Sequence, residues 1–277
     1  MNPIILTIGS LELRWYGVMV ALAILTVVFW TYYQTKKGAK ITSDQVLSGF
    51  IIGTISGIIG ARLLHVIDYW SYYSAHPENI IGGDGLAIYG GILGAALGLL
   101  IYSKFSKFKA LYLFDVMAPG IAFSQAVGRI GCLINGCCYG AQCDLPWAIS
   151  YSHPDSFAER LNVGYHPTQV YEMIFMVILG LGLILLKKKI RFMGSQFYMY
   201  FGCYSVFRFA VGFIRDNETV VGNLVQSQVI GLVASIICFG LLGYNYYKYK
   251  KNGSADPELA AIEADAPVEE VKEESEE

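Results

Sequence analysis

The sequence predicts an all-α polytopic membrane protein with about seven transmembrane helices, an N-terminus outside the cell and a C-terminus in the cytoplasm. Three observations support this fold class. Only 15% of the 277 residues are charged, against about one quarter in soluble domains, and 55% are hydrophobic. Seven apolar segments are long enough to cross a bilayer. The lysines between these segments alternate along the chain, and this alternation predicts their orientation.

The predicted spans are separated by short polar connections. They comprise residues 15–33, 46–67, 86–102, 112–127, 169–186, 194–213 and 224–247. The third and fourth spans are short, and we expect Pro119 and Gly120 to break the fourth helix. No cleavable signal peptide is expected, because residues 1–14 lack a basic start and are only partly apolar.

The lysines lie in every second connection, at residues 36–40, 104–109 and 187–191, and again after the last span at 248–251. The other connections contain no lysine. Because an excess of Lys and Arg marks cytoplasmic loops, the lysine-bearing connections are predicted to face the cytoplasm. The loop between the fourth and fifth spans is then predicted to lie outside.

The last residues differ in composition from the rest of the chain. From residue 254 onward there are ten acidic residues against one lysine, with few large apolar side chains. Such a segment cannot bury enough apolar surface to fold alone. We therefore divide the chain into a transmembrane domain, residues 1–253, and an acidic cytoplasmic tail, residues 254–277, which is predicted to be disordered. A binding role for the tail is the alternative.

Six arginines lie inside or at the outer side of predicted spans, against the charge rule. They are Arg14, Arg62, Arg129, Arg160, Arg208 and Arg215. An arginine at the bilayer centre costs about 2.5–3.5 kcal/mol on insertion scales, so it is usually paired or faces a wet cavity. A single arginine is explained by snorkelling or by a pair with Asp68 or Asp115. Several that converge predict a pocket for an anion such as a phospholipid phosphate, which a guanidinium binds with two donors.

Other polar or small residues occur close to the predicted outer surface. In the third span, Gly90 and Gly91 permit either the close approach of a ligand to the backbone or close helix packing. Tyr16 lies one step inside the first span. Glu172, at the start of the fifth span, is read as a favourable helix-dipole charge, as a carboxylate that orients an arginine, or as a base. His166 is either a proton-transfer group or a structural residue.

A cysteine-rich stretch, "AVGRIGCLINGCCYGAQCD", covers residues 126–144. Its cysteines, Cys132, Cys137, Cys138 and Cys143, have the spacing C-x4-CC-x4-C, whereas structural zinc sites prefer C-x2–4-C pairs. Two disulfides are therefore favoured over zinc in a loop outside the cytoplasm. Thiol chemistry assisted by Arg129 stays open. We expect neither a metal nor a cofactor.

Part of this stretch, "GRIGCLINGCCYG", resembles the signature of the prolipoprotein diacylglyceryl transferases, whose usual form is G-R-x-G-N-F-x-N-x-E-x-x-G. The segments "RWYG", "YGGILG", "DVMAPGIAFSQAVGR", "HPTQVYE" and "RF…FIRD" also occur in the order of that family. The resemblance covers roughly residues 14–216.

The resemblance implies transfer of the diacylglyceryl group of phosphatidylglycerol to the lipobox cysteine thiol of a lipoprotein precursor, with release of glycerol phosphate. It implies a multi-pass protein of the bacterial inner membrane with an active site at the outer face. The expected partners are phosphatidylglycerol, precursor signal peptides and membrane lipid, and nucleic acid is not expected. Catalytic candidates are Arg129, Arg208 and Tyr89. Substrate-binding candidates are Arg129, Arg208, Tyr16, Arg62, Gly90, Gly91, Asn135, Gly140, His166 and Glu172, with Asp115 as an internal polar support.

The sequence also departs from the pattern of the family. Tyr89 stands where the family usually has a histidine, Cys132 and Cys137 replace the signature asparagine and glutamate, and Gly212 replaces a glutamate in the sixth span. Two alternatives follow from these departures. One is a divergent relative that acts on the same lipid with another acceptor or with thiol chemistry. The other is a membrane protein that binds lipid or anions without catalysis.

Overall fold

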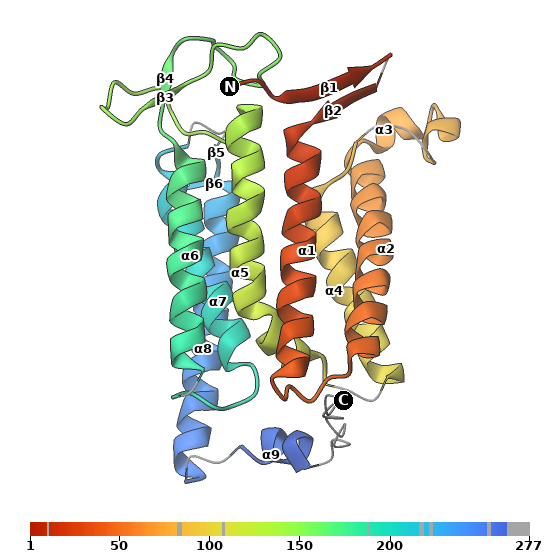
Figure 1. Ribbon diagram of the computed structural model, residues 1–277, viewed down its shortest axis with the longest axis vertical. Coiled ribbons are helices and arrows are strands. Elements are labelled where there is room, and N and C mark those ends of the chain that lie inside the picture. Colours follow the sequence, from red (N-terminus) through yellow and green to blue (C-terminus); the bar gives the residue numbers. More distant parts are fainter. Residues whose placement is uncertain are drawn as a thin grey trace, which may run out of the picture.

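A computed structural model of the chain describes residues 1–9, 11–81, 85–106, 109–187, 189–215, 219–221, 224–253 and 256–264. Within these ranges, seven long helices run between the two ends of the molecule (Figure 1). They are α1 (Trp15–Lys36), α2 (Ser43–Asp68), α4 (Ile88–Phe105), α5 (Ala110–Asn135), α6 (Thr168–Leu186), α7 (Ser195–Gly212) and α8 (Gln226–Lys251). Each of the seven predicted spans coincides with one of these helices.

Small elements cover the end of the bundle where the N-terminus lies, which we call the hairpin end (Figure 1). Three antiparallel two-stranded sheets occur there: β1 (Ile4–Ile8) with β2 (Leu11–Arg14), β3 (Ile149–Ser150) with β4 (Gly164–Tyr165), and β5 (Thr219–Val221) with β6 (Leu224–Val225). The short helices α3 (Trp70–Tyr73) and η1 (Pro77–Asn79) follow α2. Helix α9 (Pro257–Ala264) lies at the opposite end, the α9 end.

Helix α5 is central to the packing, because it contacts α1, α6 and α7. Its small residues Ala118 and Ala122 are completely buried and pack with Met176 of α6 and Tyr200 of α7. Small side chains at such a contact let the helix backbones approach closely, as is typical of helices in membranes. Helices α7 and α8 form a second close pair, and α2 and α4 form a third.

The outer surface of the bundle is strongly apolar. Large side chains such as Phe29 and Leu185 are 71% and 74% exposed, which suits contact with lipid rather than water. Five helices, α1, α2, α5, α6 and α8, are long and apolar enough to cross a membrane. Helix α4 is apolar but shorter. The fold is thus that of an all-α membrane protein, while the count of seven spans and their orientation remain predictions.

The pair formed by α2 and α4 explains the glycines of the third predicted span. A Cβ atom added at Gly90 would overlap the carbonyl oxygen of Gly60 and the Cβ of Leu64. One added at Gly91 would lie 3.5 Å from the Cβ of Ala61. Of the two readings that the sequence left open for these glycines, the contacts favour close packing between helices.

The expected break at Pro119 and Gly120 is wrong. Helix α5 continues through both residues and ends only at Asn135. Proline removes one helical hydrogen bond, but a neighbouring helix can satisfy the backbone around it. The carbonyl that loses its helical donor at Pro119 is that of Asp115. At the next residue the indole Nε1 of Trp30 in α1 donates to the carbonyl of Val116 at 3.0 Å, and the absence of a side chain at Gly120 leaves room for the Trp30 ring.

Part of the acidic tail is helical in the structure. Helix α9 begins at Pro257, and the Glu258 carboxylate forms an ion pair with Lys109 at 2.7 Å. Asp256 accepts a hydrogen bond from the backbone N–H of Met193 at 2.8 Å. Residues 254, 255 and 265–277 lie outside the described residues, so the proposed division into two domains stays a prediction.

Candidate active site

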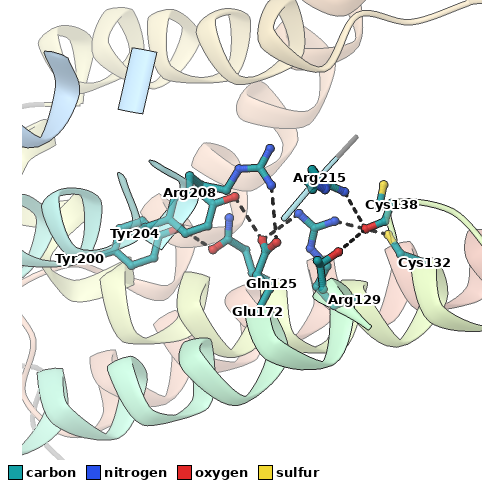
Figure 2. A network of polar contacts seen from close by, with 10 residues as sticks. Gln125, Arg129, Cys132, Cys138, Glu172, Tyr200, Tyr204, Arg208 and Arg215 are labelled. Atoms are coloured by element: carbon teal, nitrogen blue, oxygen red, sulfur yellow. Dashed lines mark hydrogen bonds and ion pairs between the residues drawn. The ribbon is translucent and has the colours of Figure 1, made fainter. Parts of the chain in front are cut away.

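Two arginines from different helices share one buried carboxylate (Figure 2). Arg129, two turns before the end of α5, donates from Nη2 to Oε1 of Glu172 at 2.7 Å. Arg208 of α7 places Nη1 3.8 Å from the other oxygen, Oε2. The Glu172 side chain is 3% exposed, and those of Arg129 and Arg208 are 17% and 19% exposed. The structure therefore brings together three residues that the sequence singled out, and Glu172 orients both arginines.

Further polar groups extend this cluster along α5 and α7 (Figure 2). The Tyr204 hydroxyl donates to Oε1 of Glu172 at 3.2 Å, and the Tyr200 hydroxyl donates to Oε1 of Gln125 at 2.9 Å. The sequence analysis did not select Tyr200, Tyr204 or Gln125. Helical spacing could have found them, because Tyr200, Tyr204 and Arg208 recur every fourth residue and so share one face of α7. Gln125 and Arg129 have the same spacing on α5.

The cluster keeps unused hydrogen-bonding capacity. Two guanidinium groups face one carboxylate, so the cluster carries a net positive charge when Glu172 is ionised. Among the described residues, the buried Arg208 Nη1, Asn135 Oδ1 and Gln169 Oε1 have no hydrogen-bond partner. Buried polar atoms are nearly always satisfied in folded proteins. Arg208 Nη1 belongs to the positively charged cluster and points to an anionic ligand, whereas the Asn135 and Gln169 amides lie beside Cys137, to which each donates.

The loop that follows α5 forms a wall at the hairpin end of the cluster. Arg215 Nη2 and Thr168 Oγ1 each donate to the Cys138 carbonyl at 2.7 Å, and Gln169 Nε2 donates to the Cys137 carbonyl at 2.7 Å. A cavity of about 430 Å³ adjoins this wall and is lined in part by Cys137, Cys138 and Arg215. From the sequence, Arg215 was recognised only as one of six arginines inside or at the outer side of predicted spans. The structure adds it to the site.

Three of the four cysteines in residues 126–144 form a cluster. The Sγ atoms of Cys132, Cys137 and Cys138 all lie within 4.8 Å of one another. All six cysteines of the chain are among the described residues, and each is a free thiol, so neither disulfide favoured by the sequence is present. Hydrogen bonds from Cys132 and Cys137 lower the pKa of Cys138, whereas hydrogen bonding with Cys132 and Cys138 raises the pKa of Cys137.

Several other predicted residues lie near this region. Tyr16 is in the first turn of α1, and its Cα is 3.4 Å from the position that a Cβ at Gly131 would take in α5. Gly140 contacts the side chain of His166 so closely that an added Cβ would be 2.8 Å from the histidine Cβ. The Nδ1 atom of His166 is buried without a hydrogen-bond partner in the described part of the chain.

Other predicted residues do not join the cluster. Arg62 of α2 donates to the backbone carbonyls of Asn79, Ile80 and Gly85, so it holds the connection between α2 and α4. Tyr89 lies in the first turn of α4 and is 47% exposed. No described contact links Tyr89 to the Arg129 cluster. Asp216, the last residue of the segment "RF…FIRD", lies outside the described residues.

A pair between Asp115 and an arginine was one of the alternatives that the sequence left open, and the structure gives Asp115 backbone partners instead. The Asp115 carboxylate accepts hydrogen bonds from the backbone N–H groups of Gly194 at 2.5 Å and Phe197 at 2.9 Å. These groups belong to the first turn of α7 and the residue before it, at the α9 end of the molecule. A carboxylate at a helix N-terminus satisfies free N–H groups and interacts favourably with the helix dipole. Asp115 is thus an internal polar support, with a partner that the sequence did not reveal.

Gly212 has a packing role that accounts for the absence of a glutamate in α7. A Cβ at Gly212 would overlap the side chain of Gln228 in α8. Gln228 is fully buried, donates to the Phe209 carbonyl at 3.2 Å and accepts from the Val225 N–H at 3.0 Å. The buried glutamine occupies the space that a side chain at residue 212 would need.

Comparison with known proteins bears directly on this arrangement. The family model described as prolipoprotein diacylglyceryl transferase matches residues 3–244, which include both arginines and Glu172. The chain belongs to the prolipoprotein diacylglyceryl transferase family. The match covers nearly all of the chain outside the acidic tail, so membership rests on the whole bundle and not on the loop signature alone.

Relatives in this family are similar over most of their length. A protein of Dehalococcoides mccartyi strain BAV1, named phosphatidylglycerol–prolipoprotein diacylglyceryl transferase, is 43% identical over 90% of this chain and 96% of its own. A protein of the same name from Clostridium novyi strain NT is 35% identical over 86% and 93% of the two chains. One from Clostridium perfringens strain 13, named as the second such transferase, is 37% identical over 88% and 94%.

Proposed function

We propose that the protein transfers the diacylglyceryl group of phosphatidylglycerol to the lipobox cysteine thiol of lipoprotein precursors and releases glycerol phosphate. The observation that carries this proposal is the convergence of Arg129 and Arg208 on Glu172, in which Arg208 Nη1 makes no hydrogen bond and is held only by an ion pair at 3.8 Å. A phosphodiester carries one negative charge and several acceptor oxygens, which complements that excess of donors. The names of these relatives support the same lipid and the same acceptor.

The proposed setting is the inner membrane of a bacterium. All seven long helices cross the bilayer in this proposal, with the N-terminus and the hairpin end outside and α9 in the cytoplasm. The lysines at the ends of α1, α4, α6 and α8 support this orientation, since they flank connections at the α9 end. The arginine cluster then lies near the outer leaflet, where phosphatidylglycerol and the signal peptide of a precursor meet.

The reaction joins the acceptor sulfur to a glycerol carbon of the lipid. A C–S bond forms, the bond between that carbon and a phosphate oxygen breaks, and the thiol proton leaves the acceptor. Negative charge builds up on the departing phosphate. Arg129 and Arg208 are placed to bind this phosphate and to stabilise its developing charge, and such preorganised donors are worth about 100- to 1,000-fold in rate. Glu172 holds the two guanidinium groups in position before the lipid arrives.

Other residues complete the proposed site. Tyr16 and Asn135 contact the substrates beside the last turns of α5, while His166 and Gly140 shape the outer rim. Tyr89 is proposed as a hydrogen-bond donor or base, on the strength of its position in the family motif. Arg62, Gly90 and Gly91 support the site indirectly, because their described contacts hold α2, α4 and the connection between them.

An apolar cavity offers a place for the acyl chains. It has a volume of about 940 Å³ between α1, α2 and α5 and is lined by residues such as Leu25, Phe29 and Phe123. Phe123 lies on α5, six residues before Arg129. A lipid whose phosphate is bound by Arg129 can extend its chains along α5 into this cavity, with the apolar walls excluding water.

Mass spectrometry of a synthetic lipobox peptide tests the proposal. The purified protein and phosphatidylglycerol should add one diacylglyceryl group to the cysteine of the peptide. Arg129→Lys keeps the charge but loses the two-donor fork, so we expect the rate to fall about 100- to 1,000-fold. Arg160→Lys, which alters an exposed arginine in the loop between β3 and β4, is the matched control and should retain the rate. Bound phosphatidylglycerol without peptide modification would instead favour a relative with another acceptor.

A further inference from the structure

The thiol cluster of Cys132, Cys137 and Cys138 has the dimensions of a metal site. Its Sγ atoms lie within 4.8 Å of one another. Three sulfurs around Zn²⁺, each about 2.3 Å from the ion, would be separated by about 3.8–4.0 Å. Changes of side-chain rotation that draw the sulfurs together by less than about 1 Å would therefore give three metal ligands.

The backbone explains how two adjacent cysteines face the same point. Gly136 ends α5 with φ +73°, and Cys138 has φ +64°, so two left-handed residues flank Cys137. This turn folds the loop back onto Cys132, which lies in the last turns of α5. The Sγ atoms of the adjacent Cys137 and Cys138 therefore both lie within 4.8 Å of the Cys132 Sγ.

The left-handed conformation of Cys138 is held in place by its surroundings. A non-glycine residue in this region is strained by about 1–3 kcal/mol and persists only when its neighbours determine it. Its carbonyl accepts hydrogen bonds from both Thr168 and Arg215, and the Cys137 carbonyl accepts one from Gln169. The hydrogen bonds from Thr168, Arg215 and Gln169 thus hold the strained backbone in place beside three potential ligands. The site therefore has its shape before an ion binds.

The charges around the cluster favour bound thiolates. Arg129 Nη1 points at the Cys132 Sγ, and Asn135 Nδ2 points at the Cys137 Sγ, each at 3.8 Å. Donors of this kind surround metal-bound ligands and orient them. A divalent ion with three thiolates has a net charge of −1, which is offset by Arg215, whose Nη2 donates to the Cys138 carbonyl.

We propose that Cys132, Cys137 and Cys138 bind one thiophilic divalent cation, with Zn²⁺ as the reference ion, and leave its fourth coordination position open. Binding releases the three thiol protons to solvent. A cavity lined in part by Cys137, Cys138 and Arg215 adjoins the cluster, and we infer that the open position faces it. Zinc sites with three protein ligands and one free position are the form that takes part in catalysis, whereas structural sites are closed.

The open position suggests a role for the ion, and this step rests on the proposed function. The thiol of the lipobox cysteine would displace a water molecule from the ion and lose its proton to solvent, because a metal-bound thiol is deprotonated. The resulting thiolate is the nucleophile that the transfer needs. Formation of the C–S bond converts it to a thioether, which is a weaker ligand and leaves. The ion would thus replace a protein base on the acceptor side.

Titration with Co²⁺ tests the metal site without any measurement of activity. The full-length protein is reduced with a non-thiol reductant in detergent, and Co²⁺ alone is added. We expect a sulfur-to-Co²⁺ charge-transfer band and the visible bands of tetrahedral Co²⁺, saturating at one ion per chain and abolished by Zn²⁺. Cys132→Ser, Cys137→Ser and Cys138→Ser should each weaken binding at least tenfold, whereas Cys143→Ser, in the same loop, should leave it unchanged.

Two outcomes would overturn the metal site. One is the absence of the charge-transfer band in the wild-type protein, and the other is binding of equal strength in all four variants. Circular dichroism of each variant identifies any that fails to fold, and the exposed Cys138 provides the substitution that disturbs packing least.

Addition of a lipobox peptide to the Co²⁺ protein tests the acceptor role. A peptide with cysteine should shift the visible bands, and its serine counterpart should not. If the metal binds but no lipid is transferred under any condition, the proposed function fails while the metal site stands. If chelated protein transfers lipid at the full rate, the acceptor role fails while the proposed function stands.

Discussion

At the scale of single residues, the site depends on one carboxylate shared by two arginines. Glu172 is almost completely buried, and without it the guanidinium groups of Arg129 and Arg208 would face each other in a region of low dielectric constant. Removal of one partner from a buried ion pair is strongly destabilising, because it leaves an uncompensated charge. A bound phosphate can supply the missing negative charge. We therefore expect stability and ligand binding to be coupled at this residue.

Glu172→Ala tests this coupling. We expect the variant to lose about 3–5 kcal/mol of stability, because two largely buried cations lose their shared partner. Phosphatidylglycerol should restore part of that loss, since its phosphate can occupy the same position. Thermal unfolding in detergent, with and without the lipid, measures both effects. Glu172→Gln keeps an acceptor oxygen and should lose less, so equal losses in the two variants would contradict a role in charge pairing.

At the scale of elements, pairs of helices are held by contacts between backbones and by buried caps. The pair of α2 and α4 depends on glycines, since a Cβ at Gly90 overlaps the carbonyl of Gly60. Helix α7 begins where Asp115 of α5 binds its first N–H groups. These contacts set the distances between helices, and the positions of the arginines follow from them.

Gly90→Ala separates the packing role of this glycine from a direct role in binding lipid. The added methyl group should push α2 and α4 apart and destabilise the protein by about 1–3 kcal/mol. Gly182→Ala in α6, where an added Cβ has no neighbour within 4 Å, is the control and should leave the melting temperature nearly unchanged. A raised KM for phosphatidylglycerol with an unchanged melting temperature would show that Gly90 contacts the lipid instead.

Asp115→Ala tests the cap of α7. Loss of a side-chain cap typically destabilises a helix by about 0.5–2 kcal/mol, and we expect a loss in this range. Asp144→Ala, at an exposed position in the loop after α5, serves as the control. Chemical denaturation in mixed micelles provides the comparison, and equal stabilities of the two variants would rule out a capping role.

At the scale of the whole molecule, the lysine-rich connections and the candidate site lie at opposite ends of the bundle. The connections at the α9 end carry the lysines, while Arg129 and Cys132 lie in the last turns of α5, whose C-terminal end reaches the hairpin end (Figure 1). If the lysines face the cytoplasm, both clusters lie in the outer half of the membrane. This separation would place the chemistry on the side where precursors emerge.

Trypsin treatment of membrane vesicles tests that orientation in the unmodified protein. In right-side-out vesicles we expect cleavage after Arg160, which is exposed in the loop between β3 and β4, and protection of Lys250 and Lys251. In inverted vesicles the pattern should reverse. Mass spectrometry identifies the cleaved sites, and cleavage at Lys250 in sealed right-side-out vesicles would contradict the proposed topology.

The sequence by itself determined the positions of the seven long helices and identified Arg129, Arg208 and Glu172. Runs of apolar residues are local properties of the chain, and a charged group inside an apolar span is conspicuous wherever the chain folds. The motif segments that follow the order of the family could also be recognised directly in the sequence. Tyr200 and Tyr204 were missed because tyrosine is also common in apolar spans, so their polar role depends on the neighbouring helix.

Only the tertiary structure decided which residues meet. The sequence could not show that Trp30 of α1 supports the backbone before Pro119, that Asp115 caps α7, or that Gly90 packs on α2, because each contact joins segments far apart in the chain. The cysteine cluster depends on the left-handed conformation of Cys138, which hydrogen bonds from Thr168 and Arg215 hold in place. Spacing along the chain favoured disulfides in this loop, whereas the folded backbone brings three thiols to one point.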